Sequence, residues 1–136
     1  MDVIKYIRKA YRALIKAQGY IVFDRFLPDN IGSGLYIILS DQEDRPIINK
    51  CGNSHETTIV INIIWRTQDN SSGVEADDVA EILIPLIEND GLVLDTGLTL
   101  VQGSSRKFND VTDSGVDTVF KVYRRNIYFR HIVRVN

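Results

Sequence analysis

The chain has 136 residues, of which 44% are hydrophobic and 25% charged, and its net charge is −2. This is an ordinary globular composition, and a chain of this length can bury one core, so we expect a single domain over residues 1–136. No apolar run approaches the ~18 residues that cross a membrane as a helix, so we expect no membrane partner. The single cysteine, Cys51, excludes an intrachain disulfide.

The charges are segregated along the chain. Residues 1–20 hold five basic residues and one acidic residue, and residues 118–136 hold five basic residues and no acidic one. The stretch between them holds 17 acidic residues against 6 basic ones. Such asymmetry favours complementary packing of subunits or binding to an anionic partner. The alternative is that the basic ends neutralise the acidic middle within one molecule, and the sequence leaves both explanations open.

The N-terminal segment predicts an amphipathic helix over residues 3–17. Apolar residues recur there at helical spacing, Asp2 is a suitable N-cap, and Gly19 supplies a stop. The basic residues fall on the opposite face of this helix, which is typical of a solvated surface.

Three strands are expected to follow. Residues 20–24 and 35–40 are short apolar runs separated by turn-forming residues. Residues 55–67 predict the central strand, because the run IVINIIW implies burial on both faces. Residues 41–54 are polar and contain Pro46 and Gly52, so we expect either a long, charged, arm-like loop near residues 42–54 or a hairpin arm.

A second helix is expected to begin at Ser72. Ser72 and Glu75 have the spacing of a capping box, and Asp77 and Asp78 lie in the first turns, where the helix dipole favours negative charge. Pro85 lacks a backbone donor and is therefore expected to kink or end the helix.

The remaining residues predict two strands separated by a second arm-like loop. The strands cover residues 98–102 and 116–135, and the loop covers residues 103–116. The long final strand is expected to be bulged or bent, because Arg125 and Ile127 share a parity. The order helix, three strands, helix, two strands predicts an α+β fold, with a mostly antiparallel sheet of about five strands and two packed helices.

One enzymatic hypothesis can be built from this element order. The restriction-endonuclease-like nucleases share it, and their metal site resembles Pro-Asp followed by an acid-x-Lys. Pro28-Asp29 and Asp41-x-Glu43 are present, but Lys50 does not follow an acid at that spacing. A hydrolytic Mg²⁺ site needs two carboxylates and a supporting base, so the match is incomplete. We expect no metal and no cofactor.

Three stretches together resemble the small tail-terminator, or tail-completion, proteins of tailed bacteriophages and the ring proteins of the head–tail neck. The first is IKYIRKAYRALI followed by YIVFD, the second is TTIVINIIWRT with the later helix VEADDVAEILIPLI, and the third is the closing strand VYRRNIYFRHIVRV. The resemblance covers nearly the whole chain and lies in its length, its element order and the residue patterns of these three stretches. The two long, charged loops depart from the pattern of this family. They would instead fit a podovirus-type neck ring protein or an adaptor.

The resemblance implies a structural subunit rather than an enzyme. It implies a homo-oligomeric ring, a hexamer or dodecamer, that joins the portal or connector to the tail and surrounds the DNA channel. Its partners would be portal, connector and tail proteins, and non-specific contact with packaged DNA is allowed. The protein would assemble in the bacterial host cytoplasm and reside in the neck or tail of the virion. A cyclic ring needs two different patches on each subunit, which segregated charge can supply.

The basic residues of the two chain ends are the candidate contacts with neighbouring subunits or with the DNA channel. They are Lys5, Arg8, Arg12, Lys121, Arg124, Arg125, Arg130 and Arg134. Two alternatives stay open. One is a metal-dependent nuclease that uses Asp29, Asp41 and Glu43, with Lys50 as a possible further member, and the other is a small regulatory binding protein of the same phage class.

Overall fold

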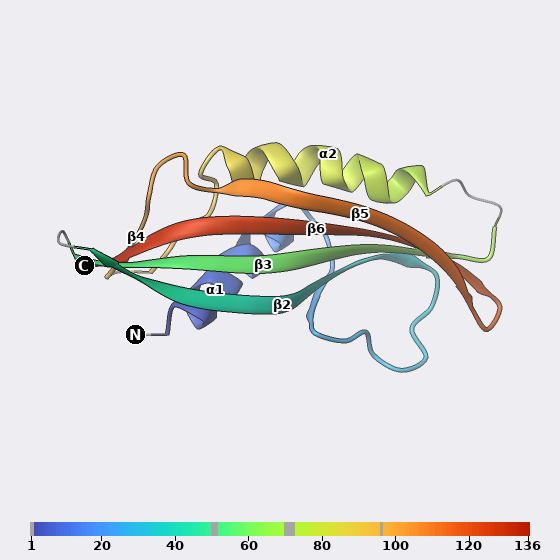
Figure 1. The fold of residues 1–136 in the computed structure, drawn as a ribbon. Coiled ribbons are helices and arrows are strands. Elements are labelled where there is room, and N and C mark those ends of the chain that lie inside the picture. The colour runs from blue at the N-terminus through green and yellow to red at the C-terminus, as the bar shows by residue number, and fades with distance from the viewer. Residues whose placement is uncertain (1, 50–51, 70–72, 96) are drawn as a thin grey trace.

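The computed structural model describes residues 2–49, 52–69, 73–95 and 97–136 (Figure 1). Its elements in chain order are α1 (Val3–Ala17), β1 (Val22–Asp24), β2 (Gly34–Asn49), β3 (Gly52–Thr67), α2 (Val74–Glu88), β4 (Leu98–Leu100), β5 (Arg106–Asp117) and β6 (Phe120–Val135). Two helices and one sheet confirm the expected α+β class.

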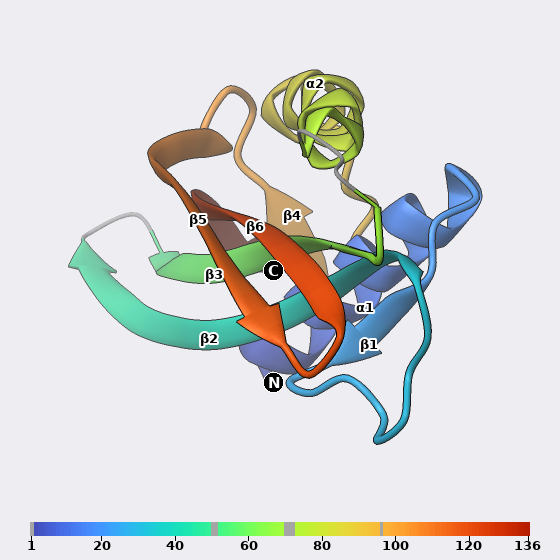
Figure 2. The ribbon, with the colours of Figure 1, turned by 90° about the vertical axis from the view of Figure 1, so that its right-hand side faces the viewer.

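The sheet has six strands where about five were expected, and it is mixed, although it is mostly antiparallel as expected. Its order is β1-β2-β3-β6-β4, and β5 also pairs with β6. β1 joins β2 in parallel, whereas every other pair is antiparallel. The connection of residues 25–33 returns the chain, so that β2 runs in the same direction as β1. The long strands curl into a half-barrel (Figure 2).

The main core lies between the inner face of the sheet and both helices. Alternate residues of the three long strands point inward, for example Ile37, Ile61 and Phe129, and all three are fully buried. They pack with Ile7 from α1 and Leu83 from α2 in one cluster. The inward-facing residues of the strands and the apolar residues of α1 and α2 therefore pack into one core.

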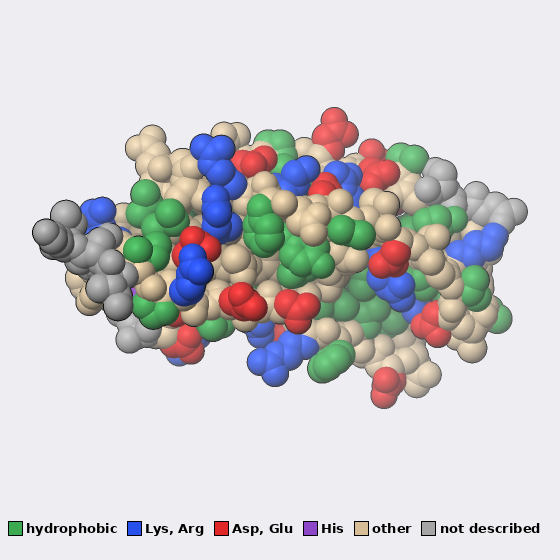
Figure 3. All heavy atoms as spheres, viewed as in Figure 1, with side chains coloured by type: hydrophobic (Ala, Val, Ile, Leu, Met, Phe, Trp, Pro, Cys, Tyr) green, Lys and Arg blue, Asp and Glu red, His purple; other side chains and the backbone are tan. Residues whose placement is uncertain are grey.

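The outer face of the sheet is not covered by either helix. A small second cluster sits there, made of Ile38, Ile64 and Val122 with Leu27 and Phe120 packed against it. The space-filling view shows this side, with Lys and Arg side chains over the left halves of β5 and β6 (Figure 3).

The hairpin arm that was one alternative for residues 41–54 is confirmed over the described residues, whereas the arm-like loop expected over residues 103–116 is wrong. Residues 42–49 continue β2, which forms a hairpin with β3, and residues 106–117 form β5. β5 lies at a sheet edge, and 11 of its 12 residues are exposed. Such a strand shows no hydrophobic alternation, which is why its sequence resembles a loop. Pro46 is tolerated in β2 because this part of the strand is an edge that needs no donor.

The final strand begins later than predicted and is not bulged. β6 pairs with β3 without a register shift from Lys121 to Val135, and the irregularity lies in β5 between Lys107 and Asn109. Arg125 shares the inward parity of Ile127 because its guanidinium pairs there with Asp77 and Asp110.

The two helices largely match their predictions. α1 has the expected bounds, and its first turn is capped by Asp2, whose carboxylate accepts from the Lys5 amide. Ser72 lies outside the described residues, and the N-cap of α2 is Gly73. Pro85 does not end α2, which continues to Glu88. Pro85 has no amide hydrogen to donate to the Glu81 carbonyl. Because Pro85 is exposed, that carbonyl lies on the solvent side of the helix.

Candidate functional site

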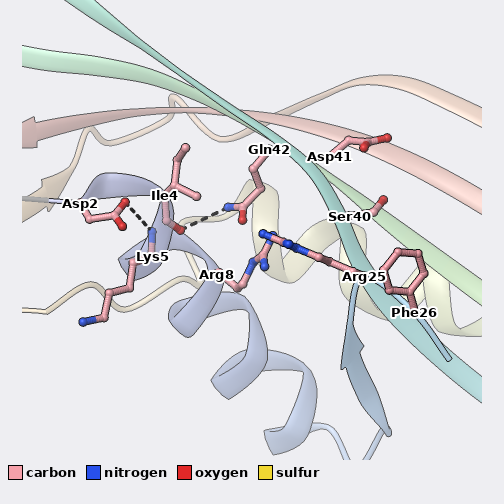
Figure 4. Close-up of a pocket in the computed structure, with 9 residues that line it drawn as sticks. All are labelled: Asp2, Ile4, Lys5, Arg8, Arg25, Phe26, Ser40, Asp41 and Gln42. Atoms are coloured by element: carbon pink, nitrogen blue, oxygen red, sulfur yellow. Dashed lines mark hydrogen bonds between the residues drawn. The ribbon is translucent and has the colours of Figure 1, made fainter. Parts of the chain in front are cut away.

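A basic cavity of about 700 Å³ lies between α1, the end of β1 and the middle of β2 (Figure 4). It is lined by Asp2, Ile4, Lys5, Arg8, Arg25, Phe26, Ser40, Asp41 and Gln42. Two of the residues predicted as contacts, Lys5 and Arg8, are therefore brought together with a third cation, Arg25. Sequence reasoning missed Arg25, because a single basic residue beside a turn carries no pattern.

Two strained residues shape this cavity. Arg25 has φ 69° and Asp41 has φ 24°, and both values are unfavourable for residues with a side chain. Arg25 is held there by its amide, which donates to the Leu39 carbonyl at 3.0 Å, and Asp41 falls where the β2–β3 register shifts. Such conformations cost on the order of 1–3 kcal/mol each and cluster at functional sites.

The polar groups of the cavity leave donors available for an anion. The Arg8 and Arg25 side chains both extend into the hollow, and Phe26 stands at its rim (Figure 4). The Arg8 Nε atom is buried without a hydrogen-bond partner among the described residues, and its nearest carboxylate, that of Asp24, lies 3.9 Å away. Gln42 donates through Nε2 to the Ile4 carbonyl, while its Oε1 atom is buried without a described partner. Such unsatisfied buried groups favour an additional ligand.

Several of the other predicted contact residues are neutralised within the molecule. Arg12 pairs with Asp24 at 2.9 Å, and Arg124 pairs with Asp113 at 3.0 Å. Arg125 contacts both Asp77 and Asp110, at 3.1 and 2.8 Å. Its hydrogen bond holds the pKa of the Asp110 carboxyl below its usual value. The internal explanation of the charge asymmetry therefore accounts for these arginines.

A second group of cations lies on the outer face of the sheet. Arg130 and Arg134 are exposed on β6, and Arg106 of β5 stands directly opposite Arg130. Within the described residues none of the three has an ion-pair partner. Like charges that face each other across a strand pair are destabilising, so this cluster favours an anion that approaches from outside. Lys121 is half-buried at the other end of β6, opposite Thr67.

The nuclease candidates do not form a metal centre in the described part of the chain. No group of three or more His, Cys, Asp or Glu residues is placed there to hold a metal ion, so Asp29, Asp41 and Glu43 do not make one. Lys50 lies outside the described residues. Among the described helices, none has the length and apolar character of a membrane span.

Comparison with known proteins gives matches among solved structures but none at the level of sequence families. No family model and no curated protein matches the chain. Its fold is similar to that of a solved chain described as "Virion of native gene transfer agent (GTA) particle", with a TM-score of 0.68 and 20% sequence identity. The match covers 97% of this chain and 94% of that chain, so the two share their fold over almost their whole lengths.

Proposed function

We propose that this protein is a structural subunit of a phage-like virion, and that it forms a ring at the head–tail junction between the portal or connector and the tail. The observation that carries the proposal is the near-complete structural match to a chain of a gene transfer agent particle. The resemblance of three sequence stretches to tail-terminator and neck proteins points independently to the same class.

The distribution of charge is compatible with a ring. Internal ion pairs neutralise Arg12, Arg124 and Arg125. Two separate sets of cations have no ion-pair partner among the described residues, namely Lys5 and Arg25 in the basic cavity and the arginines of the outer sheet face. A head-to-tail ring needs distinct surfaces for its neighbours and for its lumen. We assign the outer face, with Arg106, Arg130 and Arg134, to the DNA channel, where cations would contact phosphates without sequence preference.

Particle assembly without this protein tests the proposal. The gene for the chain is disrupted in the genome that encodes it, and the particles are examined by electron microscopy. We expect DNA-containing heads and separate tails, and complementation with the wild-type chain should restore joined particles. Complete, infectious particles that lack the chain would contradict a structural role at the junction.

A further inference from the structure

We propose that the basic cavity receives the exposed face of α2 from a second copy of this chain. The inference rests on the proposed ring and names the two surfaces that meet in it. The first, the basic pocket, consists of Lys5, Arg8, Arg25 and Phe26. The second, the acidic stripe, consists of Val74, Asp78, Glu81 and Ile82.

The basic pocket combines unpaired positive charge with an exposed aromatic ring. Among the described residues, neither Lys5 nor Arg25 has a carboxylate within ion-pairing distance, and the buried Arg8 Nε atom has no hydrogen-bond partner. Phe26 is 79% exposed at the rim. A carboxylate entering the hollow would accept a hydrogen bond from the buried Arg8 Nε atom, and an apolar neighbour beside it would cover the Phe26 ring.

The acidic stripe offers the complementary chemistry on a rigid element. Asp78 and Glu81 are three residues apart in α2, so they share one helix face, and both are exposed without an ion-pair partner in the described structure. Ile82 and Val74 flank them with exposed fractions of 45% and 50%. Asp77, which lies next to Asp78 in the sequence, differs from these two residues because it forms an ion pair with Arg125.

The two surfaces lie on different elements and therefore suit a head-to-tail contact. α1 packs mainly against β1, β2 and β3, whereas α2 packs against β3, β5 and β6 (Figure 2). Each subunit can therefore offer its pocket to one neighbour and its stripe to the other, which is the arrangement that closes a ring. Nucleic acid is a poorer occupant of the pocket, because two carboxylates, Asp2 and Asp41, also line it and a phosphate backbone has no apolar group for Phe26.

A charge-swap series tests this contact. One variant carries Lys5→Glu and Arg25→Glu, a second carries Asp78→Lys and Glu81→Lys, and a third carries all four changes. Light scattering after size exclusion and native mass spectrometry give the oligomeric state of each over a range of protein concentrations. We expect each double variant to need at least ten-fold more protein to assemble, and the four-fold variant to assemble again because its charges are complementary once more.

Matched controls reverse equally exposed charges elsewhere. Lys16→Glu with Arg45→Glu controls the basic change, and Asp29→Lys with Asp69→Lys controls the acidic one. Circular dichroism checks that every variant is folded. Arg8 is left unchanged, because it lies beside Asp24 and its reversal would disturb the fold.

The outcomes separate this contact from the ring itself. A wild-type chain that assembles while the double variants assemble equally well overturns the α1–α2 contact and leaves the ring in place. A wild-type chain that stays monomeric at every concentration and at low salt contradicts the ring and the contact together. If the Lys5 and Arg25 reversal abolishes binding to a duplex oligonucleotide but leaves assembly unchanged, the occupant is nucleic acid and the proposed partner is wrong.

Discussion

At the scale of single residues, a buried polar chain links α1 to the closing strand. The Tyr11 hydroxyl contacts His131 Nε2, and His131 Nδ1 lies 2.7 Å from the Ser105 hydroxyl. All three side chains are buried. A neutral imidazole donates from one ring nitrogen and accepts at the other, so it can satisfy both hydroxyls at once. The group is closed to solvent and holds the core together.

The pH dependence of stability follows from this burial. Desolvation lowers the pKa of His131 to about 4 from its ordinary value of 6.5. Between these values the unfolded chain binds a proton that the folded chain excludes, so stability is fully present above pH 6.5 and falls as the pH falls towards 4. We expect the free energy of unfolding, measured with urea, to decrease by about 3 kcal/mol over this range.

The variant His131→Gln provides the control for this measurement, since glutamine does not titrate. It should be less stable at pH 7 but should lose most of the pH dependence between 6.5 and 4.5. The lowered pKa values of Asp110 and Asp117 act mainly at lower pH. Equal slopes for both proteins in that window would show that His131 is not the titrating group.

Single charges were the least predictable feature of the sequence. The basic residues of the final strand could be recognised as a group, yet only the fold decides which of them meet an acid. Arg124 and Arg125 are neighbours in sequence but point to opposite faces of the sheet, where they meet Asp113 and Asp110 respectively. Arg130 and Arg134 lie on the outer face and have no ion-pair partner in the part of the chain that the structure describes.

At the scale of elements, Arg125 ties three of them together. It joins β6 to β5 through Asp110 and to α2 through Asp77, and its side chain is 22% exposed. Arg124 makes one ion pair, and its side chain is 43% exposed. This neighbouring pair of arginines provides a matched comparison.

We expect Arg125→Gln to lower the free energy of unfolding by about 2 kcal/mol, because it removes a partly buried ion pair with Asp110 together with the contact to the exposed Asp77. Arg124→Gln should cost less than about 1 kcal/mol, since a single exposed ion pair contributes little. Urea denaturation of both variants gives the two values. A larger loss for Arg124→Gln than for Arg125→Gln would contradict the assignment of Arg125 as the structural residue.

The elements that the sequence revealed are those with a buried face. α1 was predicted at its observed bounds, because apolar residues recur at helical spacing and a cap precedes them. The central strand β3 was recognised from its apolar run. β5 could not be recognised, and residues 42–49 of β2 could be assigned only as a loop or a hairpin arm. An edge strand is stabilised by pairing with its neighbour and needs no hydrophobic alternation of its own.

At the scale of the whole molecule, the segregated charge has two consequences. Some of the charged residues form internal ion pairs, which hold β5 and α2 on β6. The remainder forms a basic pocket beside α1, an acidic stripe on α2 and a cationic outer sheet face. The pocket could not be read from the sequence, because Lys5, Arg25 and Asp41 are far apart along the chain and meet only through the β1–β2 pairing.

A cryo-electron microscopy reconstruction of the head–tail junction, in particles made by the genome that encodes this chain, tests the central claim most directly. We predict a closed ring of this chain between portal and tail, with the outer face of its sheet towards the DNA channel and α1 of each subunit beside α2 of the next. A junction that is complete at side-chain resolution and contains no copy of this chain would contradict the account.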